Sequence, residues 1–365
     1  MGKLYPDRPA VSVIIPCYNV EAYIDRCLAS IAVQTIGMEN LELICVDDAS
    51  TDDTWNRLLL WEQLYPEQVI LIRQEVNRRQ GAARNLGLQY ASADWISFVD
   101  ADDWLESDYF ERLYGPTIQF DCDVVCCKYG RDASESLTYY DKSYRQEEGE
   151  ERYLVADTEE VTKLLIRSRI LGEGAPTKLI RRKFLLDFEI LFPENLMYED
   201  MYWYTLLHVY AVGVYLIEEK LYHYFLNPRS TVLSKEENYH IDWVTMQARK
   251  YSDYNRRGIW EKYRDELEFD ALYNASGFIK LIILRYNEPP FSFFQLEREL
   301  IRKWVPDYRS NPYAESFPMI EMCEVFLGAL YSPMDKAGFL QMVKEARDYY
   351  DRSRKLFTPV SPTHG

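Results

Sequence analysis

The sequence has no apolar run long enough to cross a membrane and no segment typical of a secreted protein. Its longest apolar stretches fall well short of the roughly 18 residues that a bilayer span requires. Residues 1–13 contain no apolar stretch of the signal-peptide kind. We therefore expect a cytoplasmic protein without a transmembrane segment, and peripheral association with the inner face of the membrane stays open.

Cysteine pairs of the CxxC type are also absent. The seven cysteines are an odd number, and no two of them form a CxxC pair. Several lie inside apolar stretches such as 43–48 and 123–129. The usual zinc and redox motifs use CxxC spacing, so we expect buried free thiols in a reducing compartment.

Positive charge is scarce, because 42 Lys and Arg face 59 Asp and Glu and leave a net charge of −17 at pH 7. An acidic protein is not attracted to phosphate backbones by bulk electrostatics, which argues against a nucleic acid partner. If such a protein binds a diphosphate, it must supply local positive charge. A divalent metal ion is the source that we expect.

Two phosphate-binding motifs are missing as well. A dinucleotide-dependent dehydrogenase would carry GxGxxG after a strand, and this sequence has none. A nucleotidyltransferase would carry a Gly-rich loop soon after its first strand. Here the first predicted strand is followed by Pro16-Cys17-Tyr18-Asn19, so a nucleotidyltransferase is retained only as an alternative.

What the first part of the chain does contain is a regular alternation of strand-like and helix-like segments. Short apolar runs predict strands at 11–15, 41–46, 69–72, 95–99 and 124–127. This alternation implies parallel strands joined by crossover helices. The predicted fold class is α/β, with a Rossmann-like, mostly parallel sheet flanked by helices and followed by a C-terminal helical region.

Local signals refine this prediction. Asn19 is expected to cap the first helix, and Ser50 with Asp53 forms a predicted capping box for the second helix. The charged, Tyr-rich residues 130–155 predict an exposed loop, and 197–210 predict a helix dense in aromatic residues.

Polar residues follow three of the predicted strands, at 16–19, 47–48 and 100–103. In open sheets with parallel strands, ligands bind outside the carboxyl ends of the strands. The three polar clusters fall at such ends. We therefore expect the binding site along this edge of the sheet.

The acidic cluster at 100–103 suggests a metal site. Carboxylates crowded at a strand end are costly unless a cation lies between them. Mg²⁺ and Mn²⁺ accept such oxygen ligands together with substrate phosphates, and we assign Asp100 and Asp102 to the metal. A solvated turn that caps a helix is the competing interpretation, because the D-x-D pattern is short.

Other polar residues have one chemical and one structural interpretation each. Asp47 or Asp48 can accept a hydrogen bond from a uracil N–H or a ribose hydroxyl, while the structural interpretation of this segment is helix capping by Ser50 or Thr51. Arg84 can hold a phosphate or pair with an aspartate, although a lone Arg on a helix is usually solvated.

A second acidic pair, Glu199-Asp200, follows Tyr198 at the start of the aromatic helix. An acid in a first helical turn usually complements the helix dipole. Surrounded by aromatic rings, however, Asp200 can have a raised pKa and act as a general base. Lys178 and Arg229 are cations on either side of this segment, and we place them with Glu199 on the diphosphate or acceptor side.

Taken in order, these segments resemble the family-two glycosyltransferases with the GT-A fold, of the bacterial capsule and cell-surface polysaccharide type. The motifs that carry the resemblance are VSVIIPCYN at 11–19, VDDASTD at 46–52, GAARNLG at 81–87, FVDADD at 98–103, Tyr198-Glu199-Asp200 and Tyr222-His223-Tyr224. Each motif alone is weak, but six in the right order are specific.

The resemblance implies an enzyme that moves a sugar from a nucleotide-sugar donor, with Mg²⁺ or Mn²⁺ as cofactor and usually with inversion. It implies that Pro16, Tyr18, Asn19 and Asp48 hold the nucleoside, commonly uridine. Asp100 and Asp102 would form the DxD motif, and Asp200 would be the base. The implied neutralising cations for the diphosphate are Arg84, Lys178 and Arg229.

The resemblance has limits. Many members carry a glycine where this chain has Asn77-Arg78-Arg79-Gln80. We expect residues 1–235 to be the catalytic domain, with a donor half at 10–128 and an acceptor half at 129–235. Residues 236–365 would be a helical extension for acceptor binding or self-association. A catalytically silent protein that binds sugar nucleotides or glycans is the main alternative.

Overall fold

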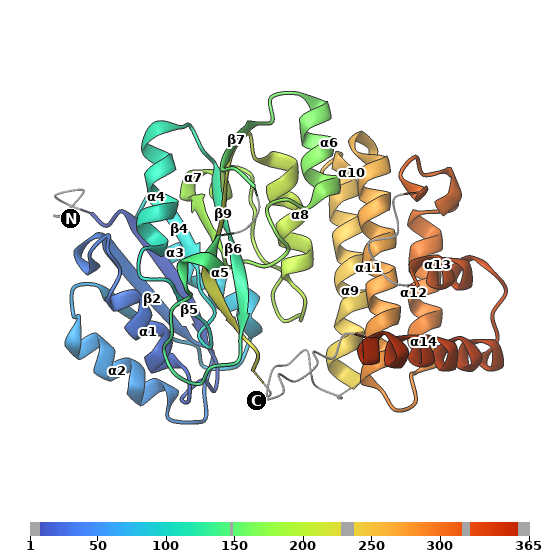
Figure 1. Cartoon of the computed structure of the whole chain (residues 1–365), viewed down its shortest axis with the longest axis horizontal. Helices are drawn as coiled ribbons and strands as arrows, with labels where there is room; N and C mark the ends of the chain where they lie inside the picture. The colour runs from blue at the N-terminus through green and yellow to red at the C-terminus, as the bar shows by residue number, and fades with distance from the viewer. Residues whose placement is uncertain (1–7, 147–148, 228–236, 316–321, 357–365) are drawn as a thin grey trace, which may run out of the picture. The chain divides into compact units, whose positions relative to one another are not determined.

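The structure is a computed structural model, and it describes residues 8–146, 149–227, 237–315 and 322–356 (Figure 1). The chain divides into two compact units, residues 1–230 and 231–365. All seven cysteines are buried free thiols, as the sequence predicts. Among the described helices, none combines the length and the apolar character that crossing a bilayer demands.

The described part of the N-terminal unit is built on one nine-stranded sheet, in the order β3-β2-β1-β4-β8-β6-β9-β5, with β7 also paired to β9 (Figure 1). The strands are β1 (Val11–Cys17), β2 (Leu41–Asp47), β3 (Val69–Arg73), β4 (Trp95–Phe98), β5 (Trp104–Leu105), β6 (Val124–Asp132), β7 (Arg152–Val155), β8 (Lys178–Arg181) and β9 (Gly213–Phe225).

The first half of this sheet is parallel and the second half is mixed. Strands β3, β2, β1 and β4 are parallel to their neighbours. Strand β8 is antiparallel to both β4 and β6, while β6 is parallel to β9. Strands β5 and β7 are antiparallel to β9. The predicted α/β fold class is confirmed, and each of the five predicted strands is present.

Helices join the strands and cover the sheet. In the N-terminal unit they are α1 (Ile24–Ala32), α2 (Thr54–Leu64), α3 (Arg79–Tyr90), α4 (Tyr109–Gln119), α5 (Lys142–Arg145), α6 (Glu159–Ser168), α7 (Arg182–Asp187) and α8 (Asp200–Tyr210). Because α1, α2 and α3 are the crossovers between parallel strands, they bring the carboxyl ends of β1, β2 and β4 to one edge.

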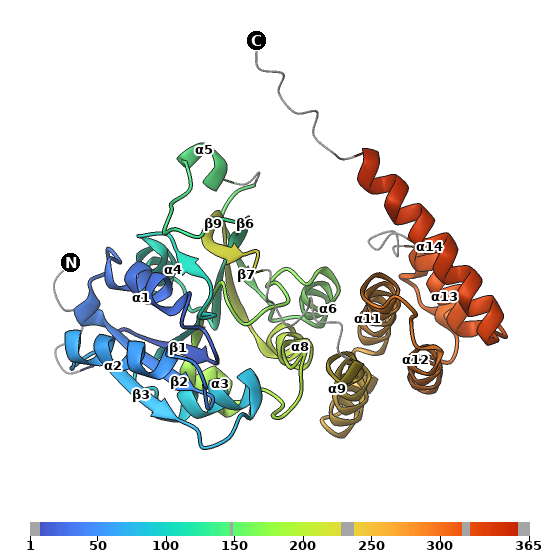
Figure 2. The ribbon, with the colours of Figure 1, turned by 90° about the horizontal axis from the view of Figure 1, so that it is seen from below.

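Helices α1 and α3 lie on opposite faces of β1 (Figure 2). Val13 and Ile15 belong to the apolar core that includes the buried face of α1. Ile14 points to the other face, where a Cβ on Gly87 of α3 would lie only 2.5 Å from its Cγ2. This close approach, which a glycine permits, fixes α3 and its Arg84 against the sheet.

The predicted helix caps are wrong. Helix α1 begins only at Ile24, and Asn19 has a positive φ of 52°. Its side-chain oxygen instead accepts from the backbone N–H of Thr51 at 2.8 Å, and its own N–H donates to Ser50 Oγ at 3.0 Å. The two loops that follow β1 and β2 therefore cap each other, because they lie side by side at the sheet edge.

The predicted exposed loop at 130–155 is also only partly right. Strand β6 continues to Asp132, α5 covers 142–145, and β7 covers 152–155. Strand β7 pairs with β9 at the edge of the sheet. The sequence of β7 has no period-two pattern of polar and apolar residues from which a strand could be predicted.

The C-terminal unit is helical, as the sequence predicts. Its described helices are α9 (Glu237–Arg256), α10 (Ile259–Lys262), α11 (Arg264–Arg285), α12 (Phe291–Trp304), α13 (Cys323–Tyr331) and α14 (Lys336–Leu356). Its core contains buried polar pairs. Lys250 Nζ donates to Asp270 at 2.6 Å, and the Gln247 amide donates to both carboxylate oxygens of Glu297 at 2.9 and 3.0 Å.

Candidate active site

The parallel register brings the first two polar clusters to the same edge of the sheet. Cys17 at the end of β1 pairs with Asp47 at the end of β2. The N–H of Asp48 then donates to the carbonyl of Cys17 at 2.8 Å. Pro16, the second-last residue of β1, is half-buried, and Tyr18 just beyond the strand is 46% exposed. The predicted nucleoside residues thus lie together.

The two adjacent aspartates have different environments. Asp47 is fully buried, with its carboxylate bound by Ser50 N–H at 3.2 Å and by Arg73 Nε at 3.0 Å. Its oxygens therefore serve the fold of the loop. Asp48 keeps Oδ1 between Gln74 Nε2 at 2.8 Å and Arg78 N–H at 2.7 Å. Burial raises the pKa of Asp48, and the backbone N–H donors oppose that shift.

A pocket opens beside this aspartate pair. It has a volume of about 440 Å³ and is lined by Ala49, Ser50, Arg73, Gln74 and Glu75. Its lining comes from the residues that follow β2 and β3, both at the carboxyl edge of the parallel strands. The position agrees with the ligand site expected for an open α/β sheet.

Arg84 joins segments that are far apart in the sequence. Its guanidinium donates through NH1 to Glu199 Oε1 at 2.5 Å and through NH2 to Asp100 Oδ1 at 2.8 Å. The Arg84 and Glu199 side chains are 6% and 2% exposed, so this is a buried ion pair. Of the two interpretations of Arg84, the pairing with an aspartate is the one that the structure contains.

The acidic loop after β4 is held by strand β9 and the residues beyond it. Asp103 is buried and accepts from Tyr222 Oη at 2.6 Å and from Phe225 N–H at 2.7 Å. The N–H of Asp100 donates to the same Tyr222 hydroxyl at 3.2 Å. Asp102 accepts from the Asn227 amide at 2.9 Å. Burial raises the pKa of Asp102, and the Asp100 charge adds to that effect.

Asp100 and Asp102 fit a divalent cation. Arg84 contacts the Asp100 carboxylate and the Asn227 amide contacts that of Asp102. A cation between them would relieve the burial and mutual repulsion that raise the pKa of Asp102. Among the described residues no group of three Asp, Glu, His or Cys side chains gathers for a metal, and a site with two carboxylates completed by phosphate oxygens is common for Mg²⁺.

Asp200 begins helix α8, directly after the Arg84 partner Glu199. One of its oxygens accepts from Met201 N–H at 2.9 Å. Burial and the neighbouring Glu199 charge raise the pKa of Asp200 to about 7, although Arg84 acts in the opposite direction. A carboxylate that titrates near neutrality has the basicity that a general base needs.

Lys178, the first residue of β8, is 1% exposed. Its ammonium donates to the carbonyls of Gly174 at 2.6 Å and Pro176 at 3.2 Å, so it fixes the loop before β8. Burial lowers the pKa of Lys178 to about 8. The predicted role of Lys178 toward the diphosphate stays a prediction, and Arg229 lies outside the described residues.

Sequence reasoning missed the residues that orient the aspartates. Gln74 binds Asp48, Asn227 binds Asp102, and Arg26 donates to the carbonyl of Asp102 at 2.6 Å. These are single polar residues on separate elements, so no local pattern marks them. Only Tyr222 lay in a recognised segment, Tyr222-His223-Tyr224.

Comparison with known proteins gives a family match and named relatives. Residues 12–186 match the family model described as Glycosyl transferase family 2. The chain is 29% identical over 273 residues to EpsH of Bacillus subtilis (strain 168), which is named as a glycosyltransferase; the match covers 74% of this chain and 76% of EpsH. It is 30% identical to the poly(ribitol-phosphate) beta-N-acetylglucosaminyltransferase TarS of Staphylococcus aureus (strain Mu50), over 58% of this chain but only 35% of TarS.

Among solved structures, the chain resembles residues 1–349 of S. aureus TarS in complex with UDP. The TM-score is 0.62, the identity is 19%, and the match covers 94% of this chain and 91% of the TarS chain. The complex of the same TarS fragment with UDP-GlcNAc gives a TM-score of 0.55. At this identity the likeness establishes the shared fold.

Proposed function

Because residues 12–186 of this chain form a glycosyl transferase family 2 domain, we propose that this glycosyltransferase moves a sugar from a UDP-sugar to a hydroxyl group with inversion. The proposed acceptor is a glycan or another polyhydroxylated chain of a bacterial cell-surface polymer, either free or lipid-linked. The TarS relative, named for poly(ribitol-phosphate) and crystallised with UDP and UDP-GlcNAc, supports this choice of substrates.

One observation carries the proposal. Arg84 contacts Asp100 on one side and Glu199 on the other, so the proposed metal residues and the proposed base belong to one polar centre. Glu199 and Asp200 are consecutive, which supports a base beside the proposed donor end of this centre. An inverting transferase needs this combination of a donor site and a single base, because no covalent sugar–enzyme intermediate forms.

The donor roles follow from position. Asp48, with Oδ1 fixed by Gln74 and Arg78, offers a carboxylate acceptor to a uracil N–H or a ribose hydroxyl. We assign Pro16, Tyr18 and Asn19 to the same nucleoside site, and Asp47 to holding its loop. Arg84, Lys178 and Arg229 are the cations that we assign to the diphosphate side.

Asp100 and Asp102 would hold Mg²⁺ or Mn²⁺. When bound, such an ion supplies Lewis-acid stabilisation of the departing diphosphate. The protein contributes the placement of the two carboxylates. Tyr222 and Asn227 fix their loop, and Arg84 keeps Asp100 turned toward Glu199.

The proposed chemical step uses one base. The acceptor oxygen attacks the anomeric carbon of the donor sugar from the face opposite the diphosphate. The new glycosidic C–O bond forms as the bond to the diphosphate oxygen breaks, and the acceptor proton passes to the Asp200 carboxylate. The products are the inverted glycoside and the nucleoside diphosphate.

Binding and turnover can be tested separately. A thermal-shift panel of uridine, guanosine and cytidine diphosphates, with and without Mn²⁺ or Mg²⁺, tests the donor site. A ligand at about a hundred times its Kd stabilises a fold by roughly 2.7 kcal/mol. We expect UDP to stabilise the protein only with metal, and Asp102→Ala to abolish that shift.

The Asp200→Asn variant tests the base. We expect it to bind UDP and metal like the wild type while it loses sugar transfer. Transfer at the wild-type rate would show that another group takes the proton. A protein that binds UDP and shows no transfer or donor hydrolysis in the wild type would instead be the silent sugar-nucleotide binder.

A further inference from the structure

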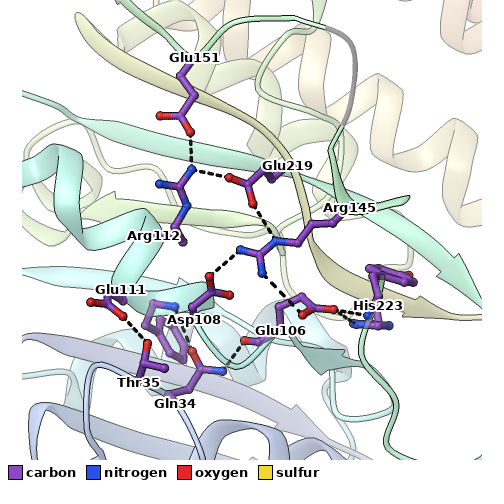
Figure 3. A network of polar contacts seen from close by, with 12 residues as sticks. Gln34, Thr35, Glu106, Asp108, Glu111, Arg112, Arg145, Glu151, Glu219 and His223 are labelled. Carbon is purple, nitrogen blue, oxygen red and sulfur yellow. Dashed lines mark hydrogen bonds and ion pairs between the residues drawn. The ribbon is translucent and has the colours of Figure 1, made fainter. Parts of the chain in front are cut away.

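His223 on strand β9 is fully buried, and each nitrogen of its ring faces a carboxylate. Nε2 lies 2.9 Å from Glu106 Oε1, and Nδ1 lies 3.1 Å from Asp132 Oδ2. Figure 3 shows the contact with Glu106 within a larger network of charged side chains. A neutral imidazole has one donor and one acceptor nitrogen, so it can donate to only one of these partners.

Both carboxylates also accept hydrogen bonds from backbone N–H groups. Glu106 Oε1 also accepts from Tyr140 N–H at 2.6 Å, and Asp132 Oδ1 accepts from Ser134 N–H at 2.8 Å. Although burial acts to raise the pKa of Asp132, the hydrogen bonds from Ser134 and His223 lower it overall. An ionised carboxylate only accepts, so the ring between the two must donate from both nitrogens as an imidazolium.

The ring faces also favour a cation. His223 is stacked between Trp104, at 4.7 Å between ring centroids, and Tyr140, at 3.7 Å. Positive charge is stabilised over aromatic faces, most strongly over indole. Two arginines also lie in this region: Arg145, 3.8 Å from Glu106, and Arg26, whose guanidinium lies 4.0 Å from the Trp104 ring centroid.

This buried centre lies directly behind the acidic loop. Trp104, the residue after Asp103, pairs with His223 in the β5–β9 ladder. The residues flanking His223 hold the loop, since Tyr222 and Phe225 bind Asp103 and the Tyr222 hydroxyl accepts from Asp100 N–H. Any shift of β9 relative to β5 would therefore move Asp100 and Asp102.

The imidazolium also limits negative charge near the donor. Asp100, Asp102, Asp103, Glu106 and Asp132 crowd this side of the sheet, and an anionic diphosphate has to bind beside them. Arg145 is itself paired with two other carboxylates, Asp108 and Glu219, at 2.7 Å each (Figure 3). His223 is the group placed to offset both Glu106 and Asp132.

We propose that His223 is a positioning residue, protonated in the folded enzyme at neutral pH, that holds strand β9 and the Asp100–Asp103 loop in the geometry for donor and metal binding. The proposal rests on the proposed function for its catalytic meaning. The protonation state itself can be measured without any substrate.

The first test is NMR of the full chain with ¹⁵N-labelled histidine. The sequence has four histidines, which keeps the spectrum simple. His208 is an internal reference for a neutral ring, because its Nδ1 faces the Tyr204 carbonyl at 2.8 Å and its Nε2 accepts from Leu171 N–H at 3.2 Å. At about pH 8, well above the ordinary histidine pKa of about 6.5, we expect one ring with two protonated nitrogens, absent in His223→Gln. A neutral His223 ring at this pH would overturn the proposal.

The second test separates positioning from simple packing. The Kd of UDP with Mn²⁺ is measured for wild type, His223→Gln, Glu106→Gln and the double variant. We expect His223→Gln to weaken binding by about 10- to 100-fold, the usual loss for a group that orients metal ligands. The double variant should recover part of the loss, because it removes one of the two carboxylates, Glu106 and Asp132, that His223→Gln leaves without the ring.

Equal binding by His223→Gln and wild type would refute the positioning role, and a double variant as weak as His223→Gln would indicate packing alone. If the wild type fails to bind UDP with any divalent metal, the proposed donor is wrong. The NMR result then decides the protonation of His223 independently.

Discussion

The base assignment predicts a specific pH dependence of the chemical step. With the pKa of Asp200 near 7, only about a tenth of the enzyme carries the base form at about pH 6, and about nine tenths carries it at about pH 8. The rate of the chemical step should therefore rise about tenfold across this range. Hydrolysis of the donor by water needs the same base, so the profile can be measured without the natural acceptor.

Glu199→Gln is the informative perturbation. The Glu199 charge raises the pKa of Asp200, and removing it also leaves Arg84 without one of its two partners. Both changes favour the ionised form of Asp200, so the midpoint of the profile should move toward acid. The rate of the chemical step in Glu199→Gln, divided by the wild-type rate, should therefore be higher at about pH 6 than at about pH 8.

A matched control is Glu194→Gln, which removes a more exposed carboxylate paired with Arg78. Single-turnover rates of donor cleavage, measured from about pH 5.5 to 8.5, isolate the chemical step from product release. We expect the Glu194→Gln midpoint to equal that of wild type. If Glu199→Gln leaves the midpoint in place, or if wild type shows no inflection near neutrality, the electrostatic account of Asp200 is refuted.

Three further predictions concern stability and the acidic loop. Burial raises the pKa of Glu297 to about 8, above its unfolded value, so its stabilising effect is complete below about pH 4.5 and declines as pH rises toward 8. By linkage the decline in the free energy of unfolding reaches at most about 5 kcal/mol. Urea unfolding at about pH 5 and 8 should therefore show a smaller change in this free energy for Glu297→Gln than for wild type. Equal changes in the two proteins would exclude the effect. Gly81→Ala should weaken the fold and donor binding, because its Cβ would lie 2.3 Å from the Pro193 carbonyl oxygen. The control Gly115→Ala meets no atom within 4 Å and should stabilise α4 by up to about 1 kcal/mol. Equal melting temperatures for the two variants would contradict this prediction. Asn227→Ala removes the amide partner of Asp102 and should weaken Mn²⁺-dependent UDP binding about 10-fold or more. Titration calorimetry of the variant and of wild type measures this change, and equal Kd values would disprove it.

The sequence was sufficient to predict the parallel half of the sheet. Strand β2 is buried along its whole length, and continuous apolar runs of this kind mark strands covered on both faces. The polar residues after β1, β2 and β4 then had to lie at one edge, because parallel strands share the direction of their ends. That argument placed Asp48 and the acidic loop without any knowledge of tertiary contacts.

The antiparallel half could not be predicted in the same way. Strand β8 has only four residues and begins with a buried lysine, and its position between β4 and β6 depends on packing that no local pattern encodes. The contact between Arg84 and Glu199 joins residues 115 positions apart. Only the resemblance suggested that these segments meet, and the contacts of Arg84 with Glu199 and Asp100 could not be predicted from it.

The dependence of the acidic loop on β9 has a consequence for protein synthesis and for fragment design. The family match ends at residue 186, whereas the groups that fix Asp100, Asp102 and Asp103 are Tyr222, Phe225 and Asn227. A ribosome-bound chain that has emerged only to residue 186 holds all the donor-side segments but lacks Asp200 and the strand that orients the aspartates. Its proposed nucleotide site would therefore lack these contacts until some forty further residues have left the exit tunnel, and a fragment cut at the family boundary would carry the motifs without the groups that fix them.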